Sequence, residues 1–192
     1  MLKKAESFMI LFFVGLLPFI MVLGNSMFIP ILPSIQADLS LNTVQAGLIL
    51  TCFSIPAAML IPVAGLLSDR YGKRKLALVS LILIMLGSVI AVISGHEVVK
   101  GQALLWMLGG RLLQGVGAGG IAPLAMVFAS ELFAGKQLNK ALGVLEAFNG
   151  AAKVLSPMIG GLIVAVSWYY SFAVFFCECS PCFLRHAAFV QA

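Results

Sequence analysis

The stretch GLLSDRYGKRK, from Gly65 to Lys75, separates two long apolar segments and holds one acidic residue beside a basic cluster. Gly72 permits the positive φ angle of a very short turn. The carboxylate of Asp69 can accept charge-assisted hydrogen bonds from Arg70 or Arg74, or lie at the N-terminus of a facing helix. The stretch therefore predicts a tight, charged turn between two apolar helices, held by a contact that can be broken.

The composition around this turn is that of a membrane protein. The chain has 192 residues, of which 61% are hydrophobic and 10% charged, whereas roughly a quarter of the residues of a soluble domain are charged. Successive uncharged runs are each long enough to cross a bilayer, which takes about 20 residues. A soluble enzyme is excluded, and the first apolar segment is interpreted as a retained helix rather than a cleaved signal. The net charge of +5 is interpreted as a signal that orients the helices in the membrane. The sequence has no pattern that indicates nucleic-acid binding.

The basic residues alternate from loop to loop. They gather in the N-terminal tail, in the loop after the second apolar segment and in the loop after the fourth: Lys3, Lys4, Arg70, Lys73, Arg74, Lys75, Lys136 and Lys140. The intervening loops hold only Lys100. By the positive-inside rule the N-terminus is cytoplasmic, in a multi-pass protein of the cell membrane. For Lys73 and Lys75 individually, this topology signal is the simpler interpretation.

The fold class predicted is an all-α membrane bundle. Apolar segments predict transmembrane helices near residues 8–30, 43–67, 76–94, 103–130 and 141–166, with the start of a sixth from 168. Together they form one N-terminal domain, residues 1–176, without a linker or a short repeat.

The last residues, 177–192, read CECSPCFLRHAAFVQA and do not continue a membrane helix, because Glu178, Pro181, Arg185 and His186 interrupt the apolar run. Either the sixth helix is poorly inserted or the chain ends in an atypical tail of the kind that a frameshift or truncation produces, and we favour the tail. Its Cys177, Cys179, Cys182 and His186 have a spacing that could hold zinc, but we predict no metal site.

The turn resembles the loop between helices two and three of the major facilitator superfamily of secondary transporters, which has the pattern G-x-L-[AS]-D-[RK]-x-G-[RK]-[RK]. The matching positions are Gly65, Leu67, Ser68, Asp69, Arg70, Gly72, Lys73 and Arg74. In that family the motif holds the two halves of the transporter together on the cytoplasmic side and takes part in gating. The resemblance assigns that role to Asp69, Arg70 and Arg74. Gly65, without a side chain, allows a neighbouring backbone to come close.

A second block, RLLQGVGAGG, lies in the fourth segment at Arg111–Gly120. Arginine within a span is costly, so Arg111 is expected to face a polar cavity or a partner, and snorkelling to the interface is the alternative. Gln114 lies on nearly the same helix face, while Gly115 and Gly119 form a strip for close helix packing. The block resembles the family's R-x-x-Q-G motif, common in proton-coupled antiporters, where the arginine is associated with proton transfer.

The fifth segment contains a core of Ser156, Pro157, Gly160 and Gly161, which is similar to the family's antiporter signature G-x-x-x-G-P-x-x-G-G. Ala152 and Ser156 occupy positions where the signature has glycine. Both side chains are small, so the size requirement of the signature is kept although the match is imperfect. Proline is expected to kink the helix and the glycine pair to pack tightly, in the family against a helix of the other half. The signature is associated with exporters rather than importers.

The same segment carries Glu146, Asn149 and Lys153 on one stripe. Glu146 and Lys153 lie about 20° apart around the helix and ~10.5 Å apart along it. We expect this stripe to face a water-filled cavity, with Glu146 as the leading proton-coupling candidate. The alternative is that Glu146 reaches the cytoplasmic headgroups.

The first segment, LGNSMFIPILPSIQADL, resembles the opening helix of drug–proton antiporters, but with a difference. Many such exporters have an acidic residue in the middle of this helix, where this chain has Gly24 and Asn25. Asn25 is then a candidate hydrogen-bonding group in the cavity. Without an acidic residue in this helix, Glu146 becomes the more important candidate for proton coupling.

These resemblances imply a proton-coupled exporter of drugs or small lipophilic metabolites, present here as an N-terminal half. The proton gradient would supply the energy, with no cofactor and no enzymatic reaction. Besides the lipid bilayer and a small-molecule substrate, the expected partner is a C-terminal half or a second copy, because family members have twelve helices in two halves. Two alternatives remain: a regulatory partner of a full-length transporter, and an inactive truncated membrane fragment.

Overall fold

The computed structural model describes residues 4–94, 102–164, 167, 171 and 172. In this part of the chain the regular elements are all helices: α1 Lys4–Ser26, α2 Phe28–Leu39, α3 Thr43–Tyr71, α4 Lys73–Ile93, α5 Ala103–Leu132 and α6 Lys136–Val164. Five stretches are long and apolar enough to cross a membrane, with α1 and α2 contributing one of them together. The prediction of an all-α membrane bundle is confirmed.

The helix predicted at 8–30 is two helices in series. α1 ends at Ser26 and α2 begins at Phe28, and the combined span reaches Leu39. Pro30 explains the break, because it has no N–H to donate to the carbonyl of Ser26 one turn earlier. Beyond α2, Ser40 adopts a positive φ of 51°, and Asn42 begins α3 with a capping box in which its side chain accepts from the N–H of Gln45 at 2.8 Å.

Other boundaries also differ from the prediction, because helices extend beyond the apolar core. α3 ends at Tyr71 rather than at 67, α4 begins at Lys73, directly after Gly72, and α6 begins at Lys136. The added turns consist mainly of polar and charged residues that hydropathy alone does not assign to a span. The expected sixth helix from 168 and the tail 177–192 fall almost wholly outside the described residues, although Ser171 and Phe172 are helical and buried.

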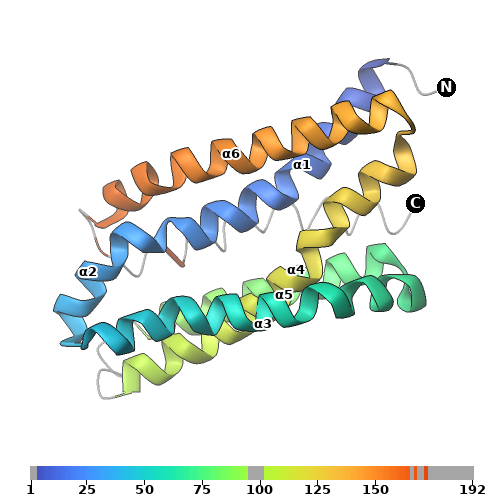
Figure 1. Cartoon of the computed structure of the whole chain (residues 1–192). Coiled ribbons are helices and arrows are strands. Elements are labelled where there is room, and N and C mark those ends of the chain that lie inside the picture. The colour runs from blue at the N-terminus through green and yellow to red at the C-terminus, as the bar shows by residue number, and fades with distance from the viewer. Residues whose placement is uncertain (1–3, 95–101, 165–166, 168–170, 173–192) are drawn as a thin grey trace.

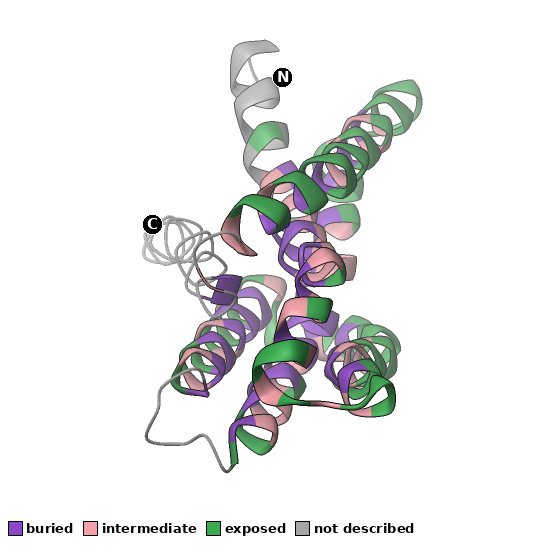
Figure 2. Ribbon diagram, turned by 90° about the vertical axis from the view of Figure 1, so that its left-hand side faces the viewer, coloured by how far each residue is buried: buried purple, intermediate pink, exposed green. Residues whose placement is uncertain are grey.

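The helices form two layers (Figure 1). α6 packs along α1 and α2 in one layer, while α3 and α4 pack along α5 in the other. α5 also contacts α1 and is the most buried span, whereas α3 and α6 are the least buried. Figure 2 shows the buried residues gathered where the helices meet, with exposed residues along the outer faces. The centre of α5 is therefore the part of the bundle most enclosed by protein.

Small residues make the contact between α5 and its neighbours possible. A Cβ atom at Gly119 would lie 2.5 Å from the carbonyl oxygen of Ala57 in α3, and one at Gly117 would lie 2.5 Å from the carbonyl oxygen of Ser80 in α4. Gly115 similarly meets the backbone of Phe53. The predicted strip of Gly115 and Gly119 is thus a site of close helix packing, against α3.

Candidate functional site

Arg111 lies two turns into α5 and is fully buried, with none of its surface exposed. Its Nη1 donates to Oε1 of Gln114, one turn along α5, at 3.3 Å. The Nε2 of Gln114 then donates to Oγ of Ser88 in α4 at 2.9 Å, and Ser88 donates to the carbonyl of Ile84. A chain of hydrogen bonds therefore runs from the guanidinium across the interface between α5 and α4.

Three phenylalanine rings surround the guanidinium. Its carbon lies 3.4 Å from the ring centre of Phe28 in α2, 5.5 Å from that of Phe53 in α3 and 5.5 Å from that of Phe172. The rings of Phe28 and Phe172 also contact each other, with centroids 4.6 Å apart. Cation–π attraction to these faces offsets part of the cost of burying the charge.

The guanidinium still has two donors without acceptors. Its Nε and Nη2 atoms are buried and have no hydrogen-bond partner in the structure. Within the described residues no carboxylate pairs with Arg111, so its charge is balanced only by rings and by one amide oxygen. The guanidinium of Arg111 can therefore still donate hydrogen bonds to an acceptor that a helix movement or a bound molecule brings close to it.

Sequence analysis found part of this cluster. The pairing of Arg111 with Gln114 follows from their spacing on one helix, and full burial contradicts snorkelling to the interface. Ser88, Phe53 and Phe172 were missed because they come from three other parts of the chain. A polar Ser88 within the very apolar α4 is the one signal that could have indicated a partner.

The stripe on α6 lies apart from this cluster. Glu146 is exposed and accepts from Nδ2 of Asn149 at 3.5 Å, while Lys153 is exposed and makes no ion pair or hydrogen bond with the described residues. Two further amide oxygens, Oδ1 of Asn25 and Oδ1 of Asn149, are buried without a partner. Several membrane-depth polar groups are thus left without a counterpart.

The antiporter-like motif of α6 divides between two sides of the helix. Ser156 is buried and its hydroxyl donates to the carbonyl of Leu23 at 2.8 Å, and Gly160 packs against the carbonyl of Met27 at the break between α1 and α2. Pro157 and Gly161 are exposed instead, and α6 continues through the proline. Of the glycine pair, only the exposed Gly161 is left for a helix outside this bundle.

Ser156→Ala should lower the thermal stability of the chain in detergent by about 1 kcal/mol, because it removes the hydrogen bond that ties α6 to α1 and leaves the carbonyl of Leu23 with only the N–H of Met27 as a donor. The matched control is Ser54→Ala, since the exposed Ser54 hydroxyl bonds only to its own helix, at the carbonyl of Leu50. Unfolding followed by circular dichroism would show the loss only in the first variant. Equal losses in both variants would mean that the hydrogen bond between α6 and α1 contributes no more to stability than a hydrogen bond within one helix.

The charged turn is as short as predicted. Gly72 has φ +88° and joins α3 directly to α4. Asp69, Arg70 and Arg74 are exposed, and the Arg70 guanidinium lies 5.6 Å from the ring centre of Tyr71. A Cβ at Gly65 would meet nothing within 4 Å, so this bundle contains no close approach there.

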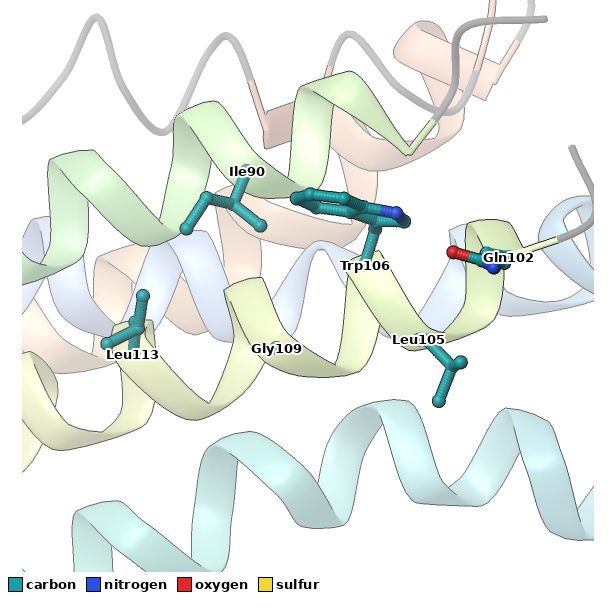
Figure 3. A pocket seen from close by; sticks show the side chains of 6 residues that line it. All are labelled: Ile90, Gln102, Leu105, Trp106, Gly109 and Leu113. Carbon is teal, nitrogen blue, oxygen red and sulfur yellow. The ribbon is translucent and has the colours of Figure 1, made fainter. Parts of the chain in front are cut away.

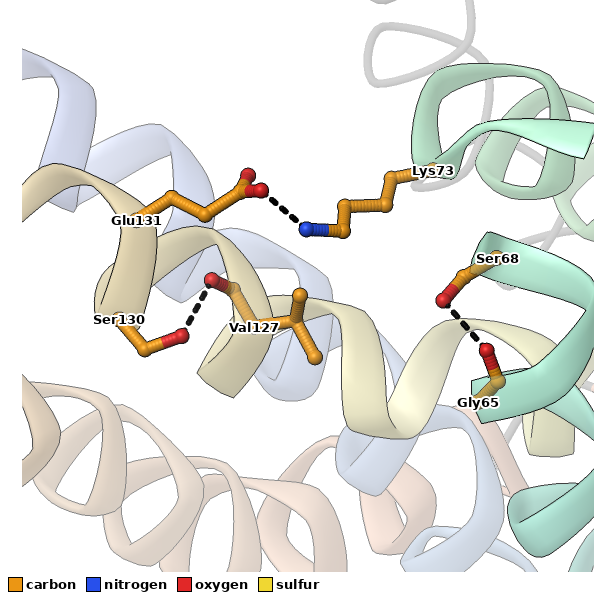
Figure 4. A network of polar contacts seen from close by, with 6 residues as sticks. All are labelled: Gly65, Ser68, Lys73, Val127, Ser130 and Glu131. Carbon is orange, nitrogen blue, oxygen red and sulfur yellow. Dashed lines mark hydrogen bonds and ion pairs between the residues drawn. The ribbon is translucent and has the colours of Figure 1, made fainter. Parts of the chain in front are cut away.

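The ion pair at the turn is not the one that the sequence suggests. Lys73 pairs with Glu131 in the last turn of α5 (Figure 4), whereas Asp69 makes no hydrogen bond or ion pair with another described residue. Because α4 begins at Lys73, the ammonium reaches the end of α5. Lys73 is therefore more than a topology signal. Together the turn and α5 form a pocket of about 380 Å³, lined by Tyr71, Gly72, Lys73, Arg74, Lys75, Phe128 and Glu131.

A second hollow lies between α4 and α5 (Figure 3). It measures about 370 Å³ and is lined by Ile90, Gln102, Leu105, Trp106, Gly109 and Leu113. It does not include Arg111 or Gln114. Its surface is mainly apolar, as expected of a helix face that meets lipid.

The described residues contain no cluster of histidine, cysteine and carboxylate side chains that could hold a metal ion. The tail cysteines and His186 lie outside them. The prediction that this chain has no metal site stays a prediction.

A bundle of membrane-spanning helices with an unpaired arginine and other polar groups at membrane depth is the arrangement of a membrane transporter. The comparisons agree, since the model of the Major Facilitator Superfamily matches residues 14–189. The chain belongs to this family and is a multi-pass membrane protein. The family consists of transporters rather than enzymes. Part of the segment 177–192 falls within the match, and its atypical character stays a prediction.

Among curated relatives, the bacillibactin exporter of Bacillus subtilis is 40% identical over 157 residues, which cover 81% of this chain and 39% of that exporter. The multidrug transporter protein MdtP of Bacillus subtilis is 32% identical and matches 74% of this chain and 25% of its own length. The chain thus spans well under half the length of these relatives.

Among solved structures, the proton:xylose symporter XylE matches with a TM-score of 0.80 at 15% identity, covering 99% of this chain and 45% of that one. This likeness concerns the fold alone. It agrees with the prediction of a half-bundle of the superfamily.

Proposed function

We propose that this chain is the N-terminal half-bundle of a proton-coupled exporter of drugs or small lipophilic metabolites. The observation that carries the proposal is Arg111, two turns into α5, which is buried, pairs with no described carboxylate and is hydrogen-bonded to Gln114 and through it to α4. A charge in such a place is retained for function, because an apolar residue would pack there at lower cost.

The names of the relatives support export as the direction. One is an exporter of bacillibactin and another a multidrug transporter, and both are similar to this chain over most of its length. The partial match of the α6 motif to the antiporter signature agrees with that direction. The N-terminus is cytoplasmic and the protein lies in the cell membrane, as the distribution of basic residues indicates.

Proton coupling falls to the polar groups at membrane depth. Glu146 is the carboxylate that can gain and lose a proton, and Arg111 is the cation whose free donors change partner as the bundle moves. Gln114, Asn149 and Asn25 relay or position these groups. The turn with Gly65, Asp69, Arg70, Gly72 and Arg74 takes part in gating on the cytoplasmic side.

Transport requires a second half-bundle, supplied by another chain or by a second copy, because alternating access consists of one half moving against the other. The most exposed spans, α3 and α6, supply the faces for this contact. Exposed Pro157 and Gly161 lie on one of them, and Asp69 lies at the end of the other.

The proposal is tested by efflux of a lipophilic fluorescent dye from bacterial cells. The chain is expressed alone and joined in frame to the C-terminal half of the bacillibactin exporter. We expect export by the joined form, its loss when an uncoupler collapses the proton gradient, and its loss in Asp69→Asn. Export by the chain alone would mean assembly with a second copy. Export by neither form would overturn transport in favour of a regulatory or inactive membrane protein.

Glu146→Gln in the exporting form should lower proton-driven efflux by about 100-fold, because the neutral amide cannot carry a proton. The matched control is Asp38→Asn, which removes an exposed carboxylate in the last turn of α2, at the very end of the first span. Efflux would be followed in cells at several external pH values. An unchanged dependence of efflux on pH in Glu146→Gln would assign proton coupling to another group.

A further inference from the structure

Three charged side chains lie more than two turns from either end of the described spans. Arg111 is in α5, and Glu146 and Lys153 are in α6. Two of these groups are cations and one is a carboxylate. The interior of the membrane-spanning region therefore has an excess of positive charge, which rises further whenever Glu146 is protonated.

The two cations lie at similar depths. A short turn joins α5 to α6, so the start of α5 and the end of α6 lie on the same side of the bundle (Figure 1). At 1.5 Å per residue, Arg111 lies ~12 Å in from that side and Lys153 ~16 Å in. The aliphatic stem of a lysine is too short for snorkelling from that depth to the interface. Lys153 must therefore meet water or an anion within the membrane.

The polar stripe lies on one flank of the core-facing side of α6. Ala152, Ser156 and Gly160 are buried, two of them directly against the end of α1. Lys153 lies about 60° from the centre of this buried face, next to the angular position of Gly160, and is exposed. The stripe therefore lies beside the contact of α6 with the break between α1 and α2, on an exposed flank of the bundle.

Neither cation has an anionic partner. Lys153 makes no ion pair within the described residues, and Arg111 has two buried donor nitrogens, Nε and Nη2, without acceptors. The unpaired oxygens of Asn25 and Asn149 are neutral amides and do not balance the charge. An exposed, unpaired ammonium at this depth is suited to an oxyanion and repels an organic cation.

We propose that the substrate is an organic anion whose carboxylate, or another oxyanion, is received by Lys153 at the level of Arg111. This inference rests on the transport proposed above and names the charge class of its substrate. Lys153 sets specificity: it favours an acid over the corresponding neutral ester by Coulomb attraction and by charge-assisted hydrogen bonds.

The test is equilibrium binding to the full chain in lipid nanodiscs. The probes are 7-(diethylamino)coumarin-3-carboxylate, which is anionic at pH 7, and its neutral ethyl ester, both followed by fluorescence anisotropy with binding to empty nanodiscs subtracted. We expect the acid to bind about tenfold more tightly than the ester after this correction. Lys153→Gln should bring the two affinities within about twofold, and Lys153→Arg should keep the preference.

The matched control is Lys140→Gln, which removes a lysine from the same helix near its start, where the side chain is exposed. It should leave the preference unchanged, and circular dichroism should show all variants folded. Equal affinities for acid and ester, binding of neither probe, or a preference that survives Lys153→Gln would each overturn the inference. The last result would also fit a Lys153 that is paired with a carboxylate of a second half-bundle.

The failure of this inference and the failure of the proposed function are distinguishable. Preferential binding of the acid without any dye export would leave the anion site standing and overturn transport. Export of the ester and of a cationic dye as efficiently as the acid, by the joined form, would leave transport standing and overturn the anion site.

Discussion

Gly115→Ala is expected to destabilise the bundle by about 3 kcal/mol, through the loss of contact between α5 and α3. A Cβ atom at this position would overlap the backbone carbonyl of Phe53, and a backbone cannot move aside as a flexible side chain can. In a membrane, where lipid tails are as apolar as leucine, close approach of this kind is a main source of helix association. The two helices would have to separate along the strip that also includes Gly119.

The measurement is thermal unfolding of the purified chain in detergent, with Gly109→Ala as the matched control. Gly109 lies on the same helix, and a Cβ there would meet nothing within 4 Å. This control should be neutral or stabilising by about 0.5–1 kcal/mol, because alanine favours the helix over glycine. If both variants had the same unfolding temperature as the unsubstituted chain, α5 would pack less closely on α3 than in the structure.

Much of the fold could be predicted from hydropathy and from the charged turn. Uncharged runs predicted the five spans, and the spacing of the glycines after Arg111 predicted the packing strip. Both features could be predicted because they depend on residues close together in the chain. The helix ends were less predictable, since α4 and α6 begin in polar residues that a bilayer-length count leaves out. The break at Met27 follows from Pro30, a local signal that the predicted 8–30 helix did not use.

The site was less predictable, for a physical reason. The contact of Arg111 with Gln114 follows from helix geometry, but the rings of Phe28, Phe53 and Phe172 reach the guanidinium only through tertiary packing. In an apolar sequence such phenylalanines are indistinguishable from ordinary packing residues. The pairing of Lys73 with Glu131, far apart in the chain, was missed for the same reason.

Arg111→Met should make the chain more stable and abolish export. The guanidinium is fully buried, has no carboxylate partner and leaves two donors unpaired. An arginine at the centre of a span costs about 3 kcal/mol, and cation–π contacts return about 2 kcal/mol or less. Gln114 would lose one hydrogen bond, worth about 1 kcal/mol or less here because it is long, 3.3 Å. Methionine fills a similar volume among the three rings, and the two offsets at their full value only just cancel the cost, so we expect a net gain between about 0 and 1 kcal/mol.

The paired measurement is thermal unfolding in detergent together with dye efflux by the form joined to a second half, with Leu112→Met as the matched control. Leu112 follows Arg111 in α5 and is exposed, so its replacement should change neither quantity. Higher stability together with lost efflux is the result expected when a residue is kept for function at the expense of folding. A lower unfolding temperature in Arg111→Met would instead make the guanidinium a structural tie between α5, α2 and α3. That outcome would remove the observation on which the proposed function rests, because burial of the charge would then be explained by packing alone.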